Sequence, residues 1–365
     1  MNRLKNILSK ISKLNDVKLT RQSNNFDALR LLAASLVLIF HAPTILGVTY
    51  KIWDPFKHVL GLSMGSFSVL TFFIISGFLI TMSWERKKNV LDFFIARILR
   101  IYPAVIVVVL LSVFVLGAIL TTENLTDYLT HNLTQKYLQN VSLFRMYYYL
   151  PEVFNTNPIS SINGSLWTLP YEFTCYLFVG ILGLLTILNK KIIALLLFVF
   201  LLIIELFFPT EVRTLVIPII GIDFKTFYTL FLYFISGSMF YILKQHIKFN
   251  IVIAIIAVLI IYGSIDTFIF NIISAILLPY IILTIAFFKP LPFKKIAKHG
   301  DFSYGLYLYA FPVQQLVVFI FGENISLVLM IILSFLFSLP LAILSWKLIE
   351  NPALQLRKKL YKIFP

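Results

Sequence analysis

The sequence has few of the residues that build disulfides or metal centres. Cys175 is its single cysteine, which excludes an internal disulfide and any metal site made of several cysteines. Because Cys175 lies in a predicted membrane span, a small buried apolar side chain is favoured over a nucleophile. His41 is the one histidine of five that falls within a predicted span. With only scattered carboxylates nearby, no metal is predicted.

Charge is also scarce. Only 13% of the 365 residues are charged, whereas 59% are apolar and the mean hydropathy is +0.91. Soluble domains carry about a quarter charged residues, so this composition excludes a soluble fold. There is no repeat of fixed period, and the polar connections are too short for a second domain.

Apolar blocks close to the ~20 residues that cross a bilayer as a helix recur along the chain. We therefore predict an all-α integral membrane protein, a single bundle of about ten transmembrane helices over residues 26–350, flanked by basic tails at 1–25 and 351–365. The predicted spans are residues 26–47, 63–83, 101–120, 166–188, 192–208, 226–243, 249–263, 268–288, 302–321 and 325–346.

Lysine and arginine are distributed unevenly between the two sides of this bundle. With the N-terminus inside, the inner segments hold 24 of them and the outer segments six, and Arg30 lies within a span. The positive-inside rule then places both termini in the cytoplasm. The net charge of +15 is explained by this topology, with anionic lipid headgroups and not nucleic acid as the partner.

One outward connection, residues 121–165, is longer than an ordinary loop and contains several asparagines and the run Tyr147 to Tyr149. Long loops of this kind are usually functional or disordered. Aromatic side chains mixed with amides suit stacking on sugar rings. Anchoring of the tyrosines at the membrane interface is the alternative.

The first span reads FDALRLLAASLVLIFH and carries Arg30 and His41, eleven residues apart. That spacing returns to within about 20° of the same helix face, roughly 16 Å further along the axis. It suits a long ligand such as coenzyme A, because a guanidinium binds phosphate and an imidazole can act on a thioester. Alternatively, Arg30 reaches the headgroups and His41 makes an interhelical hydrogen bond.

Arg97 and Arg100 follow in the stretch RKKNVLDFFIARILRIYP. Three residues apart, they lie on one helical face, where they can clamp phosphates or serve as ordinary positive-inside residues. Just upstream, Ser76 and Gly77 interrupt an apolar span and permit close helix packing or close approach of a ligand.

Glu172, in NGSLWTLPYEFTCYLF, is the carboxylate that the fourth span would bury. It can form a couple with His41, orienting the imidazole and stabilising its protonated form, or a structural ion pair with an arginine.

The ninth span begins DFSYGLYLYAFPVQQ, with Ser303, Tyr304 and Gln314. Together with Trp167, these are candidate substrate-binding residues. Hydrogen bonds that hold the bundle together are the alternative role for the ninth-span residues.

Taken in order, six stretches resemble the acyltransferase-3 family of membrane acyltransferases. They extend from residue 26 to residue 352, and they are FDALRLLAASLVLIFH, FFIISGFLIT, ARILRIYP, SLWTLPYEF, DFSYGLYLYAFP and ENP. The resemblance implies a multi-pass protein of the bacterial cytoplasmic membrane that moves acetyl groups from cytoplasmic acetyl-CoA to glycans such as O-antigen or capsule. It implies that His41 and Glu172 are catalytic and that Arg30, Arg97 and Arg100 contact acetyl-CoA.

Two departures from the family qualify these expectations. Ala310 stands where many members carry a histidine, which leaves more of the proton chemistry to His41. Some members carry an extracellular SGNH hydrolase-like domain, which we do not expect after Pro352. We expect direct transfer to the acceptor, with a partner acyltransferase outside the membrane as the alternative.

His41 can act as a general base or can itself be acetylated, and both routes are open. The rival function is a transporter or flippase for a lipid-linked sugar, which intramembrane charges would also suit. The absence of two halves with matching hydropathy argues against it.

Overall fold

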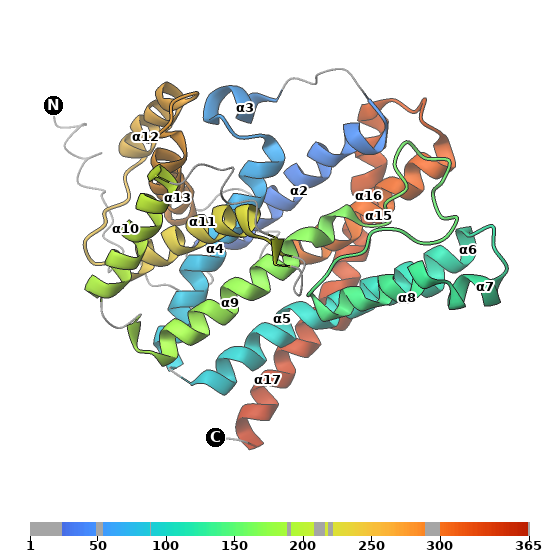
Figure 1. The fold of residues 1–365 in the computed structure, drawn as a ribbon, viewed down its shortest axis with the longest axis horizontal. Coiled ribbons are helices and arrows are strands. Elements are labelled where there is room, and N and C mark those ends of the chain that lie inside the picture. Colours follow the sequence, from blue (N-terminus) through green and yellow to red (C-terminus); the bar gives the residue numbers. More distant parts are fainter. Residues whose placement is uncertain are drawn as a thin grey trace.

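The computed structural model describes residues 24–48, 54–87, 89–187, 191–207, 216–217, 222–288 and 300–363. Nearly all regular structure in this part of the chain is helical, which confirms the all-α fold class (Figure 1). The exception is an antiparallel pair of two-residue strands, β1 (Val216–Ile217) and β2 (Ile222–Asp223). Most of the predicted N-terminal tail and the basic connection at 289–299 lie outside the described residues.

The longer helices are α2 (Phe26–Ile45), α4 (Met64–Lys87), α5 (Val90–Leu111), α9 (Leu169–Leu184), α10 (Lys191–Phe207), α11 (Phe224–Ile242), α12 (Ile251–Ser264), α13 (Phe270–Phe287), α15 (Ser303–Phe321), α16 (Leu327–Ser345) and α17 (Asn351–Ile363). The short helices are α3 (Pro55–Leu60), α6 (Ala118–Leu120), α7 (Leu125–Thr130) and α8 (Asn132–Leu138), with 3₁₀ turns at Gln139–Ser142 and Gly164–Thr168. Two π-helical turns, Ser112–Gly117 and Trp346–Glu350, continue α5 and α16.

Each of the ten predicted spans overlaps one of the helices α2, α4, α5, α9, α10, α11, α12, α13, α15 and α16. Six helical stretches are long and apolar enough to cross a bilayer: Phe26–Ile45, Met64–Arg86, Val90–Leu120, Phe270–Phe287, Ser303–Phe321 and Leu327–Arg357. The chain is thus a multi-pass membrane protein. Ten crossings and the cytoplasmic position of the termini stay predictions.

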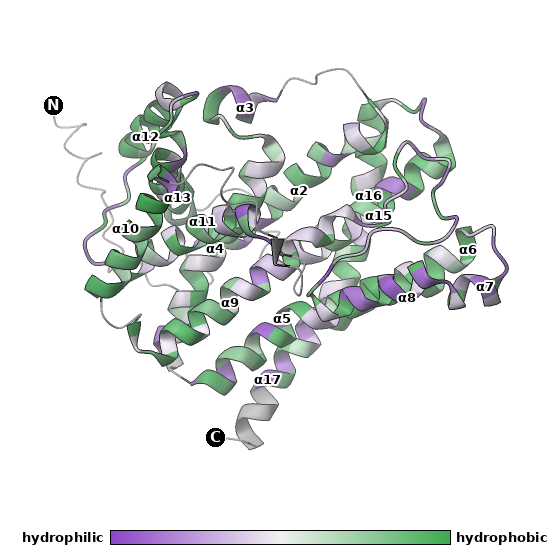
Figure 2. Ribbon diagram, viewed as in Figure 1, coloured by the Kyte–Doolittle hydropathy of each residue, from purple (hydrophilic) through white to green (hydrophobic). Residues whose placement is uncertain are grey.

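Large apolar side chains cover the outward faces of several helices. Ile192, Leu196 and Phe200 on α10 and Ile255 and Leu259 on α12 are all exposed. Figure 2 shows both helices as predominantly hydrophobic. Side chains of this kind match a lipid environment, because a bilayer favours an apolar surface that water does not.

The third span was predicted to start at residue 101, but α5 begins at Val90. Asn89 caps it, since its side chain accepts a hydrogen bond of 2.9 Å from the Asp92 amide. Arg97 and Arg100 interrupt the run of apolar residues, so hydropathy alone does not identify the first turns of α5 as part of the helix. Both arginines therefore lie within a continuous helix and not in a loop.

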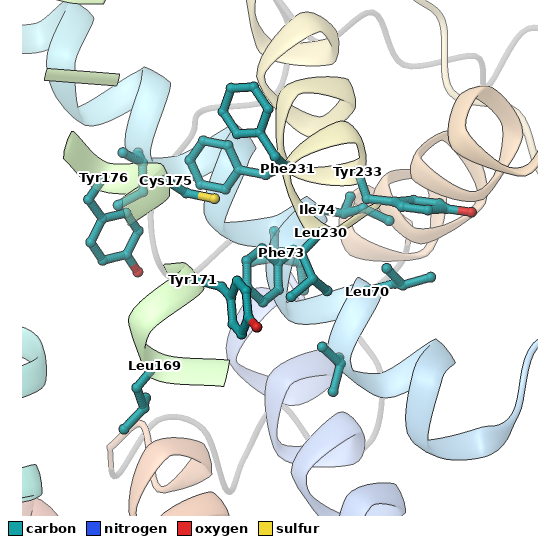
Figure 3. Packing of buried hydrophobic residues seen from close by; sticks show 14 of the residues in the cluster. Leu70, Phe73, Ile74, Leu169, Tyr171, Cys175, Tyr176, Leu230, Phe231 and Tyr233 are labelled. Carbon is teal, nitrogen blue, oxygen red and sulfur yellow. The ribbon is translucent and has the colours of Figure 1, made fainter. Parts of the chain in front are cut away.

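The core between α4, α9 and α11 depends on small residues. A Cβ on Gly77 would lie 1.9 Å from the Phe234 carbonyl oxygen, and one on Gly237 would lie 2.1 Å from the Ile74 carbonyl oxygen. The α4 and α11 backbones are thus in direct contact, which confirms close packing as a role of Gly77. Cys175 of α9 is fully buried beside this contact, as predicted for a small apolar side chain (Figure 3).

The long connection, residues 121–165, has ordered structure. Asn140 is fully buried, and its side chain exchanges two hydrogen bonds, of 2.7 and 2.8 Å, with the backbone of Tyr147. Gln315 of α15 donates to the carbonyl oxygens of Ile159 and Ser161. These amides therefore fold the segment and attach it to α15.

Candidate active site

A cavity of about 360 Å³ lies where α2, α4, α5, α9, α15 and α17 converge. We call it the arginine cavity. Its lining includes six of the predicted site residues: Arg30, Arg97, Arg100, Glu172, Ser303 and Tyr304. Residues from four helices thus come together as the sequence motifs suggested.

Two of the three arginines are held by buried carboxylates. Arg100 Nη2 lies 2.6 Å from Asp301 Oδ2, and its Nη1 lies 3.4 Å from Glu350 Oε2. Arg30 Nη1 lies 3.5 Å from the same Asp301 oxygen. Ser303 Oγ donates a hydrogen bond to the other oxygen of Asp301. One carboxylate therefore connects α2, α5 and the start of α15.

Asp301 and Glu350 were not among the predicted site residues, although both stand in motifs that were noticed. Asp301 opens DFSYGLY just before α15, and Glu350 opens ENP. The π-helical turn Trp346–Glu350 directs Glu350 inward, where Ser345 Oγ donates to it over 3.0 Å. Such turns are frequent at functional sites. The signal in the sequence that points to both residues is an acidic side chain within a motif shared with the family, next to a predicted membrane span.

Arg97 differs from its two neighbours. No ion pair or hydrogen bond to Arg97 is found among the described residues, and its Nε is buried without a partner there. Its guanidinium carbon lies 5.7 Å from the centre of the Phe93 ring and 5.8 Å from that of Tyr176. Buried polar groups are nearly always hydrogen-bonded. Of the arginines in the described lining, Arg97 is therefore the one without a polar protein partner among the described residues, which leaves its guanidinium available to a ligand.

A fourth arginine, Arg357, comes from α17. Its Nε and Nη2 donate to the two carboxylate oxygens of Asp92 on α5, over 2.9 and 2.6 Å. This bidentate ion pair holds α17 against α5 beside the cavity, and Arg357 also lines the cavity. The sequence predicts a cytoplasmic tail for residues 351–365, so Arg357 is not among the predicted site residues.

His41 lines a second cavity of about 350 Å³, here called the histidine cavity, which also contains Trp167. The two cavities share Val69 of α4 and Tyr307 of α15 as lining residues. The Tyr307 hydroxyl lies 2.7 Å from Thr168 Oγ1. The eleven-residue spacing on α2 thus places Arg30 in one cavity and His41 in the next, with Tyr307 between them.

His41 packs against two rings and has no hydrogen-bond partner among the described residues. Its ring centre lies 5.4 Å from that of Phe311 and 5.7 Å from that of Phe40. The interhelical hydrogen bond that was the alternative role for His41 is therefore not found among the described residues. In a neutral imidazole one ring nitrogen donates a proton and the other accepts one, and neither nitrogen of His41 is hydrogen-bonded to a described residue.

Glu172 does not form the predicted couple with His41, because the two side chains line different cavities. Its carboxylate accepts a hydrogen bond from the Tyr176 hydroxyl and a long one, 3.5 Å, from Ser76 Oγ. No arginine pairs with it among the described residues. The first turn of α9 directs Glu172 toward α4 and the arginine cavity. The spacing of residues along a single helix does not show which neighbouring helix a side chain faces.

Two of the predicted substrate contacts have structural bonds. Gln314 is fully buried, lines neither cavity and donates to the Leu38 carbonyl oxygen over 2.8 Å, which joins α15 to α2. Tyr304 donates to the Ile101 carbonyl oxygen over 3.1 Å, while its ring lies 5.5 Å from the Arg100 guanidinium. Gln314 therefore has the bundle-stabilising role that the sequence left open.

Comparison with known proteins agrees with this architecture. A family model described as an acyltransferase domain matches residues 23–347. An O-acetyl transferase of Shigella phage Sf6 is 30% identical over 346 residues, covering 90% of this chain and 96% of the phage protein. Nodulation protein 10 of Rhizobium leguminosarum bv. viciae is 35% identical over 162 residues, 42% of each chain. No solved structure matches. The chain belongs to the acyltransferase-3 family.

Proposed function

We propose that this protein is a membrane O-acyltransferase that moves an acetyl group from cytoplasmic acetyl-CoA to a hydroxyl of a cell-surface or lipid-linked glycan. The observation that carries the proposal is the pair of adjoining cavities, one lined by arginines and one by His41. Similarity to a phage protein named O-acetyl transferase supports the acyl group and the oxygen acceptor.

The arginine cavity fits the donor. Its described lining holds four arginines and three acids, and its volume lies within the roughly 300–1,000 Å³ of small-molecule sites. Glu350 and Asp92, outside the lining, pair with Arg100 and Arg357, so the cavity attracts an anion through Arg97 and not through a net positive charge. Arg97 would contact a phosphate directly, because its buried Nε lacks a protein partner among the described residues. Arg100 and Arg30, held by Asp301, would shape the site around it. Acetyl-CoA supplies an acetyl group activated as a thioester.

His41 is the proposed general base. In the neutral form its imidazole accepts a proton from the acceptor hydroxyl, whose oxygen attacks the acetyl carbonyl carbon. The thioester C–S bond then breaks, and coenzyme A leaves as the thiol after it receives the proton from His41. The phenol ring of Tyr307, fixed by Thr168, borders both cavities. Transfer would therefore take place at Tyr307, with the donor on one side and the acceptor on the other. A covalent route through acetylated His41 is the competing mechanism.

Glu172 would act from the donor side. It borders the arginine cavity and accepts a hydrogen bond from Tyr176, whose ring lies near Arg97. We propose that it positions the donor and Arg97, and not the His41 ring. The transporter alternative loses its support, because the chain belongs to an acyltransferase family.

The test is acetyl transfer by the purified protein in lipid nanodiscs. Release of the coenzyme A thiol measures donor use, and mass spectrometry of an extracted glycan measures its gain of acetyl. Wild type should show both activities, and His41→Ala should show neither above background. His58→Ala, an exposed histidine on α3, is the matched control and should retain activity. A wild-type protein that leaves the thioester intact with every glycan offered would refute the proposal.

A further inference from the structure

The histidine cavity differs from the arginine cavity in its polar lining. The lining includes Ser63 from the turn before α4 and Ser66 from α4 itself. It also includes Thr226 and Thr229 from α11 and Asn271 from α13. These hydroxyl and amide groups can both donate and accept hydrogen bonds, which is how a protein recognises sugar hydroxyls. Trp167 adds an indole face, on which a sugar ring can rest.

Among the described residues that line this cavity, Lys225 is the single lysine, and there is no arginine, aspartate or glutamate. It lies in the first turn of α11, and its side chain is exposed. Among the described residues it has no ion pair. The nearest acid along the chain, Asp223, is not in the lining and caps the helix by accepting a 2.8 Å hydrogen bond from the Thr226 amide. Asp223 does interact electrostatically with Lys225 from outside the cavity, but the described lining itself holds one positive charge and no acid.

The position of Lys225 on its helix strengthens this charge. The N-terminus of α11 carries the positive end of the helix dipole, which adds to the ammonium group and is offset in part by the Asp223 carboxylate at the cap. A lysine ammonium is a compact point charge on a flexible stem, suited to a phosphate or carboxylate whose exact position varies. No acid is among the described lining residues, and the Glu205 carboxylate, outside the lining, accepts a hydrogen bond of 2.8 Å from Asn271.

We infer that the histidine cavity binds an acceptor glycan through an anionic substituent, a phosphate or a sugar carboxylate, held by Lys225. Trp167 supports the sugar ring, and the acceptor hydroxyl faces His41. This inference rests on the proposed function and extends it, since it names the acceptor as acidic. Neutral glycans of the same size then bind more weakly.

The experiment measures how sugars protect His41 from diethyl pyrocarbonate, which modifies accessible imidazoles. The full-length protein in nanodiscs is treated alone or with methyl glucoside, methyl glucuronide or glucose 1-phosphate, and modification of His41 is quantified by peptide mass spectrometry. The two anionic sugars should give half-protection at concentrations roughly tenfold lower than methyl glucoside, the usual effect of one charge-assisted contact. Equilibrium binding of radiolabelled glucose 1-phosphate provides a second measurement, which does not depend on access of the reagent.

Three variants assign the effect to Lys225. Lys225→Gln should remove the preference for anionic sugars, and Lys225→Arg should keep it. Lys57→Gln, an exposed lysine on α3 outside the cavity, should match wild type. Comparison of the phosphate and carboxylate sugars shows which anion the site prefers.

Several results would overturn the inference. Equal affinity for the neutral and anionic sugars excludes an anionic acceptor, and a preference that survives in Lys225→Gln excludes Lys225. Failure of all three sugars to bind or protect excludes the cavity as a sugar site. None of these results depends on acetyl transfer. Failure of the proposed function would appear separately, as absence of coenzyme A release by wild type.

Discussion

Arg97 and Arg100 look equivalent in the Arg-x-x-Arg motif, but the structure predicts that their replacement has different consequences. Arg100 is paired with Asp301 and Glu350, whose side chains are 5% and 1% exposed. Arg100→Ala leaves two buried carboxylates without this partner, and removal of one partner of a buried pair costs about 3–5 kcal/mol. The 21% exposure of Arg100 places the loss near the lower end. A clear fall in melting temperature is expected.

Arg97→Ala should leave stability nearly unchanged. The cation–π interactions of Arg97 with Phe93 and Tyr176, which the alanine cannot make, are worth about 0.5–1 kcal/mol each at partly exposed sites. Relief of the buried, unpartnered Nε offsets part of this cost. Donor affinity should instead fall, because a charge-assisted contact to phosphate is worth about 1.5–3 kcal/mol, or roughly ten- to over a hundredfold in dissociation constant.

The assay combines thermal melting with calorimetric titration of acetyl-CoA and 3′-dephospho-CoA into nanodisc-embedded variants. Lys57→Ala, at an exposed lysine on α3, controls for loss of one positive charge and should match wild type in both measurements. The reasoning is refuted if Arg100→Ala melts like wild type, or if Arg97→Ala binds acetyl-CoA with unchanged affinity.

Three further perturbations test the rest of the site and its scaffold. His41→Ala should reduce turnover by about 100-fold or more while acetyl-CoA binding stays intact; wild-type turnover in a folded variant would exclude a catalytic role. Tyr307→Trp should narrow the boundary between the cavities, so that transfer to a glycan falls while acetyl-CoA still binds; unchanged transfer would place the reaction elsewhere. Gly77→Ala should cost about 1–3 kcal/mol through overpacking against the Phe234 carbonyl group, whereas Gly263→Ala, with nothing within 4 Å, should melt at or above the wild-type temperature.

Much of the architecture could be predicted because a bilayer imposes a strong, one-dimensional constraint on sequence. Each predicted span overlaps a helix, since about 20 apolar residues have few other folds available in a membrane. Helical periodicity also placed Arg30 and His41 correctly along one face of α2. The start of α5 was missed because inward-facing arginines resemble a polar loop when only hydropathy is considered.

The contacts between helices could not be predicted in the same way. Periodicity gives the face and the height of a residue on its own helix, but the rotation of that helix against its neighbours depends on side-chain packing. The sequence could not show for this reason that Glu172 and His41 line different cavities, with the Glu172 carboxylate bonded to Tyr176 and Ser76. For Gln314 the sequence left two roles open, because a polar residue facing the bundle can bond a ligand or a neighbouring backbone carbonyl, and the structure shows a hydrogen bond to the Leu38 carbonyl oxygen.

The two ends of α2 have opposite physical character, and the proposed reaction requires both. At Arg30, ion pairs through the buried Asp301 carboxylate join α2 to α5 and α15, so contacts within the protein position Arg30 and Arg100 in the arginine cavity. At His41, rings surround an imidazole that has no hydrogen bond to the described residues, so its proton can be gained and lost without breaking a structural contact. A network of ion pairs suits a donor held by its phosphates, and a free imidazole suits proton transfer. Tyr307, which borders both environments, is consequently the position at which we expect substitutions to separate donor binding from acetyl transfer.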